Sequence, residues 1–376
     1  MQRIYLDNAA TTPLDKEVLE AMMPFLTDDF GNPSSIHSFG RKTKSAIETA
    51  RKTIAKLLNA VPAEIIFTSG GTEADNMAIR SSVYDLGVKH IITSPVEHHA
   101  VLHTAEEISH KEKIKLSFVK LLPDGHIDFK HLEELLQQDS PALVTLMHAN
   151  NEIGNLLSIK KTGELCAKYG AYFHSDSVQT IGHYAIDTKA VHVHFLSCGA
   201  HKFHGPKGVG FLFKSEKIKI KPMMRGGAQE RNMRGGTENL YGIVGLGKAM
   251  EIAHRDMTEH QKQITEIKMY MVKQLEENIP GVLFNGDYKG ACLYTVLNVS
   301  LPSHPQGDMF LFQLDLAGIA VSGGSACASG SNKGSHVLTA INADTKRHHI
   351  RFSFSKFSTK EEIDFTIEKL KEMYKG

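Results

Sequence analysis

The chain has 376 residues, with 43 Lys plus Arg, 42 Asp plus Glu and a formal net charge of +1 at pH 7. This length is enough for two domains, each with a hydrophobic core of its own. The balanced charge argues against a protein that binds nucleic acid through bulk positive charge, so any anionic ligand is expected at a local site.

The lengths of the apolar runs and the spacing of the cysteines argue against further classes of protein. No stretch reaches the roughly 18 uninterrupted apolar residues of a membrane span, and the first residues lack the apolar run of a signal peptide. The four cysteines, at positions 166, 198, 292 and 327, form no Cys-x-x-Cys pair, and the 21 histidines include no H-E-x-x-H motif. We therefore expect a cytoplasmic protein with reduced thiols and without a disulfide framework or a metal site, and we expect no nucleic-acid or membrane partner.

The first two thirds of the chain alternate apolar strands with amphipathic helices. Strands are predicted at 64–68, 89–94, 142–150, 171–177, 193–198 and 208–213, and helices at 45–60, 69–83, from 99 onward, and at 159–170. This alternation predicts βαβ units and a mainly parallel sheet flanked by helices, an α/β fold. Ligands of such sheets bind beyond the carboxyl ends of the strands, so the loops after the strands are expected to carry the chemistry.

The pattern changes near residue 240. A long helical stretch, a strand and two further helices are predicted at 239–277, 295–300, 307–317 and 359–374. We interpret this part as a smaller α+β domain (1–13 and 258–376) beside a large domain (14–257). Within it, "SGGSACASGSNKGS" (322–335) is rich in Gly and Ser without an apolar period, which predicts a loop with Cys327 at its centre.

Three features located after predicted strands suggest a cofactor. "TSGGTEAD" places Gly71 and Thr72 where a strand turns into a helix, and the backbone N–H groups and dipole of a helix N-terminus favour an anion. By itself this is an ordinary helix start, and the Walker pattern is absent, so the phosphate of a small cofactor fits best. Asp176, in "FHSDSVQ", either caps the next helix or balances a protonated ring nitrogen, because a buried carboxylate needs a partner.

The third feature is Lys202 in "SCGAHKFHGPKGVG". A lysine at low dielectric near other cations has a lowered pKa and forms a Schiff base with an aldehyde, although a buried lysine is more often an ion-pair partner. An aldehyde-reactive amine, a phosphate-binding turn and an acid for a ring nitrogen together meet the needs of pyridoxal 5'-phosphate.

Nearly the whole chain resembles cysteine desulfurases of the NifS/IscS type, in the class V branch of fold-type I pyridoxal-phosphate enzymes. The matching stretches are "YLDNAATTP" (5–13), "GNPSSIHSFGR" (31–41), "SGGTEADNMAI" (69–79), "EHHAV" (97–101), "HANNEIG" (148–154), "FHSDSVQ" (173–179), "HKFHGPKGVG" (201–210), "RNMRGGTEN" (231–239), "SGGSACASGS" (322–331) and "IRFSF" (350–354). The resemblance implies a large domain with a mainly parallel seven-stranded sheet, a smaller α+β domain and a homodimer.

The resemblance also implies roles for residues around the cofactor ring. Lys202 would carry pyridoxal 5'-phosphate as an imine and transfer a proton during the reaction. Asp176 would pair with the ring nitrogen, and Gln179 would bind the ring oxygen. His98 would stack on the ring and take part in proton transfer, and Asn151 would contact the cofactor as well as the substrate.

The resemblance implies a phosphate site as well. Gly71, Thr72 and His201 would hold the phosphate, and Thr237 would reach it from the neighbouring subunit. Gly199 stands where most relatives carry a phosphate-binding serine, and Ser197 is a candidate to replace the lost hydroxyl.

The substrate side carries the distinguishing chemistry. Arg351, assisted by Asn151, would bind the carboxylate of L-cysteine through the paired N–H groups of its guanidinium. The thiolate of Cys327 would attack the substrate sulfur, leaving a persulfide and releasing alanine. We interpret Cys166 and Cys292 as packing residues, and the resemblance does not account for Cys198.

Two other readings remain from the residues alone. One is another class V reaction, such as selenocysteine lysis or transamination of a small amino acid, and the other is a non-catalytic interaction paralogue. Cys327 favours desulfuration, because a transaminase has no use for it. The sulfur acceptor is expected to be a protein such as an iron–sulfur scaffold, or one that serves thio-cofactor or tRNA synthesis.

Overall fold

The computed structural model describes residues 3–323 and 334–375. Its larger sheet contains seven strands in the order β2-β8-β7-β6-β5-β3-β4. The strands are β2 (Ile65–Thr68), β3 (His90–Thr93), β4 (Lys115–Phe118), β5 (Ala142–Thr145), β6 (Tyr172–Asp176), β7 (Phe195–Gly199) and β8 (Gly210–Lys214). Within this sheet only β8 runs antiparallel to the other strands, so the mainly parallel seven-stranded α/β fold is confirmed.

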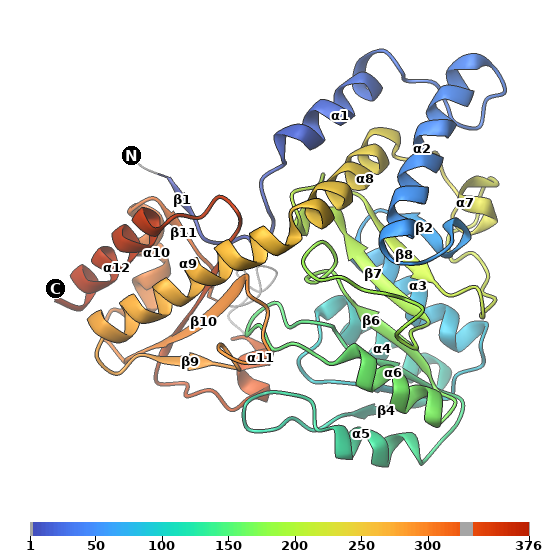
Figure 1. Cartoon of the computed structure of the whole chain (residues 1–376). Helices are drawn as coiled ribbons and strands as arrows, with labels where there is room; N and C mark the ends of the chain where they lie inside the picture. The colour runs from blue at the N-terminus through green and yellow to red at the C-terminus, as the bar shows by residue number, and fades with distance from the viewer. Residues whose placement is uncertain (1–2, 324–333, 376) are drawn as a thin grey trace.

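Helices cover both faces of this sheet (Figure 1). The helices α3 (Gly71–Tyr84) and α4 (His99–Glu112) bury Met77 and Val101 against one face. On the other face α2 (Ser38–Leu57), α6 (Ile159–Lys168) and α8 (Leu240–Arg255) bury apolar side chains such as Ile54 and Leu246. Strands buried on both faces read as continuous apolar runs, which is why β5 and β8 were recognisable in the sequence.

The C-terminal part has a core of its own. An antiparallel sheet of order β12-β10-β9, from β9 (Leu283–Asn285), β10 (Val296–Leu301) and β12 (His348–Ser353), packs against α9 (Met257–Asn278), α10 (Phe310–Leu316) and α12 (Lys360–Lys375). The N-terminal strand β1 (Ile4–Tyr5) pairs in parallel with β11 (Ile319–Ala320), which adds Ile4 and Leu6 to this core. We propose 14–257 and 1–13 with 258–376 as the two domains.

One predicted helix is divided. The segment 239–277 forms α8 and α9, which are separated at Asp256, where the backbone leaves the helical conformation (φ −104°, ψ 10°). Leu246 and Ala249 of α8 belong to the larger core, whereas Met271 and Leu275 of α9 belong to the smaller one. The helical stretch predicted there is confirmed, and its break at Asp256 lets each half bury its apolar face in a different core.

Shorter helices complete the described residues: α1 (Lys16–Thr27), α5 (Phe129–Leu136), α7 (Gln229–Asn232) and α11 (His336–Ala340), with 3-10 turns at Pro62–Glu64, Ala200–Lys202 and Gly307–Met309. None of the helices in the described ranges is sufficiently long and apolar to cross a bilayer. The carboxyl ends of β3, β5, β6 and β7 lie along one edge of the sheet, where the loops meet residues of the smaller core.

Candidate active site

A cavity of about 240 Å³ lies at this edge of the larger sheet. The predicted site residues that line it are Gly71, Thr72, His98, Asn151, Asp176, Gln179, His201, Lys202 and Arg351. They come from strand ends, from the start of α3 and from β12, across 280 positions of sequence between residues 71 and 351. The fold therefore brings together most of the residues that the motifs singled out.

Three predicted residues lie elsewhere. Thr237 lines a separate concavity together with Arg234 and Asn239, away from the cavity of its own chain. Gly199 lies directly behind the cavity wall, where an added Cβ would meet the backbone nitrogen of Gly71 at 3.6 Å. Cys327 falls outside the described residues.

The anion-binding turn is formed by backbone groups. Gly70 has φ +154° and no side chain caps α3, so the first N–H groups of the helix are left for a ligand. A Cβ on Gly71 would lie 2.5 Å from Cγ2 of Val178, so this close approach requires glycine. Burial, with Lys202 and Lys207 nearby, lowers the pKa of His201 to about 4, so its ring is neutral at neutral pH.

Lys202 ends the 3-10 turn that comes after β7. Its Nζ donates hydrogen bonds to the carbonyl oxygens of Ala9 (2.5 Å) and Ala10 (2.9 Å) in the N-terminal arm. Its own carbonyl accepts a hydrogen bond from Nε2 of His183 at 3.2 Å. The carbonyl oxygens of the arm therefore hold the amine of Lys202, whereas the end of β7 and the contact with His183 hold its backbone.

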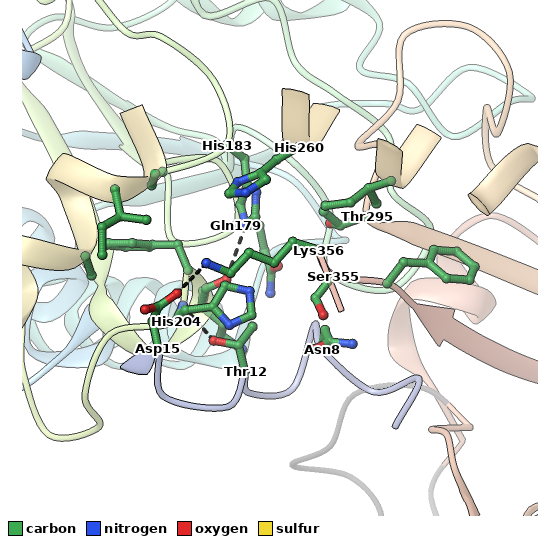
Figure 2. Close-up of a pocket in the computed structure, with 18 of the residues that line it drawn as sticks. Asn8, Thr12, Asp15, Gln179, His183, His204, His260, Thr295, Ser355 and Lys356 are labelled. Carbon is green, nitrogen blue, oxygen red and sulfur yellow. Dashed lines mark hydrogen bonds and ion pairs between the residues drawn. The ribbon is translucent and has the colours of Figure 1, made fainter. Parts of the chain in front are cut away.

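A second and smaller cavity, of about 30 Å³, has Lys202 in its lining, and Figure 2 shows the polar side chains around it. His183, His204 and His260 surround it, and an ion pair between Asp15 and Lys356 closes one side. These residues join the arm, the larger sheet and the smaller core, and they support the turn that carries Lys202.

Asp176 is a buried acid at the end of β6. Its Oδ1 accepts a hydrogen bond from the backbone N–H of Val178 at 3.0 Å. Burial, and then the nearby carboxyl of Asp75, raise its pKa to about 6. A cation in the cavity would reverse this shift, because an opposite charge stabilises the carboxylate.

A row of buried polar side chains lies beneath Asp176. His174 Nδ1 lies 2.8 Å from Oγ1 of Thr145, and its Nε2 lies 3.0 Å from Oγ of Ser197 and 3.4 Å from Oδ1 of Asp75. Burial lowers the pKa of His174 to about 4 and raises that of Asp75 to about 7. Ser197 is thus bonded inside the sheet and is not among the residues that line the cavity.

Two neighbouring residues begin α4. Burial raises the pKa of Glu97 to about 8, although its Oε1 accepts hydrogen bonds from Oγ of Ser94 (2.7 Å) and the N–H of Met147 (3.0 Å). His98 is the N-cap of α4, its Nδ1 accepts from the N–H of Ala100 at 3.1 Å, and burial lowers its pKa. Its neutral ring is therefore held in place at the cavity wall.

Arg351 is 1% exposed and projects from β12 into the cavity. Its Nη1 donates to the carbonyl of Asn151 at 2.9 Å, and its Nη2 donates to Oδ1 of Asp7 at 2.8 Å. Its Nε has no hydrogen-bond partner within the described part of the chain. Because Nε is shielded, a carboxylate ligand would instead bind the second N–H groups of Nη1 and Nη2.

The described cysteines differ in their surroundings. Cys166 and Cys198 are fully buried in the larger core, where burial raises the pKa of both thiols. Cys198 is therefore a packing residue, as was predicted for Cys166. The same prediction for Cys292 was wrong, because it is partly exposed and its Sγ accepts a hydrogen bond from Nζ of Lys268 at 3.3 Å.

Comparisons with known proteins identify the family. Residues 4–365 match the Aminotransferase class-V family. The chain belongs to this family. "Cysteine desulfurase IscS" from Dictyoglomus turgidum is 46% identical over 98% of this chain and 94% of its own length. "Cysteine desulfurase IscS" from Methanosarcina thermophila is 42% identical over 98% of this chain and 91% of its own.

Solved structures agree with this assignment. A "NIFS-LIKE PROTEIN" superimposes with a TM-score of 0.92 at 35% identity and covers 100% of both chains. A structure titled "SspA in complex with cysteine" has a TM-score of 0.81 at 32% identity and covers 95% of this chain and 100% of its own. The resemblance inferred from the motifs, and the fold that it implied, are confirmed.

Sequence reasoning missed several residues of the site. Asp7 and the carbonyls of Ala9 and Ala10 lie within "YLDNAATTP", a stretch that was matched but not assigned a role. Asp75 lines the cavity one turn of helix after Thr72. Helical spacing could have indicated Asp75, whereas the position of Asp7 depends on contacts with the opposite end of the chain.

Proposed function

We propose that this protein is a cysteine desulfurase that uses pyridoxal 5'-phosphate to convert L-cysteine to L-alanine, leaving a persulfide on Cys327. One observation carries the proposal: the amine of Lys202, the buried acid Asp176 and the guanidinium of Arg351 line the same cavity. Family relatives named cysteine desulfurases over nearly the full length support it.

The residues fit the proposed cofactor. The uncapped start of α3, which admits only glycine at position 71, offers backbone donors to a phosphate. At the other end of the cavity, Asp176 has a raised pKa that a ring cation would lower. When bound, pyridoxal 5'-phosphate supplies an aldehyde that reacts with amines and a ring that withdraws electrons from the substrate Cα.

The chain's own groups would then hold the ring and move protons. Asp176 would provide the negative charge opposite the ring nitrogen, and Gln179 would bind the ring oxygen. The neutral ring of His98, whose Nδ1 accepts from the N–H of Ala100, would carry its proton on Nε2, cover one face of the cofactor ring and donate from Nε2. Nζ of Lys202, held by the arm carbonyls, would transfer the proton at Cα.

The phosphate and the substrate would take separate ends of the cavity. Thr72 and His201 would complete the phosphate site, with Gly199 behind it. Arg351 and Asn151 would bind the substrate carboxylate. The Cys327 thiolate would form an S–S bond as the Cβ–S bond breaks, so that L-cysteine and one thiol become L-alanine and one persulfide.

A homodimer is part of the proposal. Exposed apolar side chains gather on α1, on the loop after it and at the start of α2, and include Leu19, Met23, Phe30, Ile36 and Phe39. These elements project from the body of the molecule in Figure 1. A second copy would cover such a surface, and it would bring Thr237 to the partner's phosphate site.

The proposed location is the cytoplasm, where thiols stay reduced as Cys327 requires. The proposed sulfur acceptor is a protein, such as an iron–sulfur scaffold or a component of thio-cofactor or tRNA synthesis. No metal is assigned to the reaction.

Mass spectrometry tests the proposal directly. Full-length protein supplied with pyridoxal 5'-phosphate and then with L-cysteine, without reductant, should gain one sulfur atom on the peptide that contains Cys327. Borohydride should fix a pyridoxyl group on Lys202. Absence of pyridoxyl at Lys202, or sulfur on another residue, would refute the assignment.

The variant C327A separates desulfuration from the related reactions. It should lose alanine formation from L-cysteine and largely retain cleavage of selenocysteine, which does not need that thiol. Continued desulfuration of L-cysteine by C327A would disprove the role of Cys327.

A further inference from the structure

Asp7 lies between the substrate arginine and the segment that leads to Cys327. Its Oδ1 accepts hydrogen bonds from Nη2 of Arg351 (2.8 Å) and from Oγ of Ser322 (2.9 Å). Backbone contacts reinforce this arrangement: Arg351 N–H donates to the carbonyl of Ser322 at 2.6 Å, and Asp7 forms a β-bridge with Ser353, two residues after Arg351. The carboxylate of Asp7 therefore joins the N-terminal arm to two strand ends of the smaller core.

Because Arg351 is buried, its guanidinium depends on the negative charge of the Asp7 carboxylate. The Arg351 side chain is 1% exposed and that of Asp7 is 17% exposed. A buried guanidinium without a counter-charge is costly, and loss of one partner from such a pair leaves the other unpaired. With Nη1 on the carbonyl of Asn151, the ion pair leaves the guanidinium little freedom to rotate.

The orientation that results suits a carboxylate ligand. Nη1 and Nη2 of Arg351 are each engaged by one protein acceptor, which leaves each of them one further N–H for a ligand. Bidentate recognition of a carboxylate needs a guanidinium edge that is already oriented, because ordering it on binding would weaken affinity.

We infer that Asp7 is a positioning residue that holds Arg351 in the orientation that binds the α-carboxylate of the substrate. The inference rests on the proposed role of Arg351 and adds a residue that acts through it. It also limits the effect of Asp7 to ligands that carry a carboxylate.

The N-terminal arm also contacts Lys202, the other reactive side chain of the proposed site. The carbonyls of Ala9 and Ala10, two and three residues after Asp7, accept hydrogen bonds from Nζ of Lys202. One short turn of the arm thus contacts both the amine of Lys202 and the guanidinium of Arg351. A substitution at Asp7 has to be compared with one that disturbs the arm without touching Arg351.

Steady-state kinetics of the full-length holoenzyme test the inference. In D7A the KM for L-cysteine should rise about tenfold to hundredfold, as expected for loss of a hydrogen bond to a charged group. The kcat should change little, because the lost interaction serves ground state and transition state alike. D7N keeps an acceptor oxygen for Nη2 and Ser322, so its KM should lie between those of wild type and D7A.

Two ligands distinguish a positioning role of Asp7 from a general disturbance of the site. Titration with L-alanine and with ethylamine, followed by the visible spectrum of the bound cofactor, compares an amine that carries a carboxylate with one that does not. D7A should weaken L-alanine binding about tenfold or more and leave ethylamine binding within about twofold. D15N is the matched control, because it removes another arm carboxylate that is paired with a cation, Lys356, outside this cavity.

The outcomes are distinct. An unchanged or lower KM in D7A, a KM of D7N below wild type, or equal losses for L-alanine and ethylamine would overturn the inference. Wild-type protein that forms no alanine from L-cysteine would instead refute the proposed function.

Discussion

The cavity has two walls of different origin. Its cofactor wall is built by loops after β3, β6 and β7 and by the start of α3, all within one sheet. Its substrate wall combines Asp7 near the N-terminus, Asn151 in the middle and Arg351 near the C-terminus. The first wall results from how parallel strands end together, and the second exists only once both cores have formed.

The two walls also differ in charge. The cofactor wall holds the buried carboxyls of Asp75 and Asp176, with the buried carboxyl of Glu97 near them, and burial raises the pKa of all three. On the substrate wall the acid Asp7 is bonded to a guanidinium. The cofactor wall is thus arranged for a cation still to be bound, whereas the substrate wall has its charges already paired.

The largest expected difference is between a substitution on the cofactor wall, which should change cofactor affinity, and one on the substrate wall, which should change the KM. D176N should weaken the binding of pyridoxal 5'-phosphate about tenfold to hundredfold, because it removes the charge opposite the ring nitrogen. R351K keeps a positive charge but loses the planar fork, so it should raise the KM for L-cysteine about tenfold and leave cofactor affinity nearly unchanged.

Equilibrium titration of each variant with cofactor, followed by initial-rate kinetics, measures both quantities. The comparison of the two walls fails if D176N and R351K affect cofactor affinity equally.

The buried acids in and near the cofactor wall should make the cofactor-free protein less stable as the pH rises. Glu97 has a folded-state pKa raised from 4.5 to about 8, so between these values the folded protein binds more protons than the unfolded chain. Its contribution is complete at low pH and is lost as the pH rises through about 8. E97Q should therefore gain stability relative to wild type from pH 5 to pH 8.

Thermal unfolding of both proteins across this range gives the difference in Tm. D75N should behave in the same sense up to about pH 7, where the Asp75 carboxyl titrates. A Tm difference between E97Q and wild type that does not change with pH would contradict the assigned charge state.

The smallest expected effect is a gain in cofactor affinity from a substitution at Gly199. The backbone there is extended (φ −128°, ψ 119°), and an added Cβ would make ordinary contacts of 3.6 Å. G199S should place a hydroxyl toward the phosphate turn and tighten cofactor binding about threefold to tenfold. G199A is the control and should leave the dissociation constant unchanged. Weaker binding by G199S would show that the turn lacks room for the hydroxyl.

Much of the cofactor wall could be predicted from the sequence. Gly71, Asp176 and Lys202 each lie at or just after the end of an apolar strand, and strands of a parallel sheet end at one edge. The helix break at Asp256 was not predictable, because helical periodicity continues across it while the core that receives the apolar face changes. The contact of Cys292 with Lys268 was missed for a related reason, since their pairing is tertiary.

The sequence by itself determined the α/β class, six of the seven strands of the larger sheet and the residue types of the candidate site, because local periodicity and turn chemistry specify strands, helices and the turns that connect them. Only the tertiary structure decided that Asp7 contacts Arg351, that Ser197 bonds to His174, and that the carboxyls of Asp75, Glu97 and Asp176 are buried near one another. These facts depend on burial and on contacts between distant segments, which are properties of the folded chain.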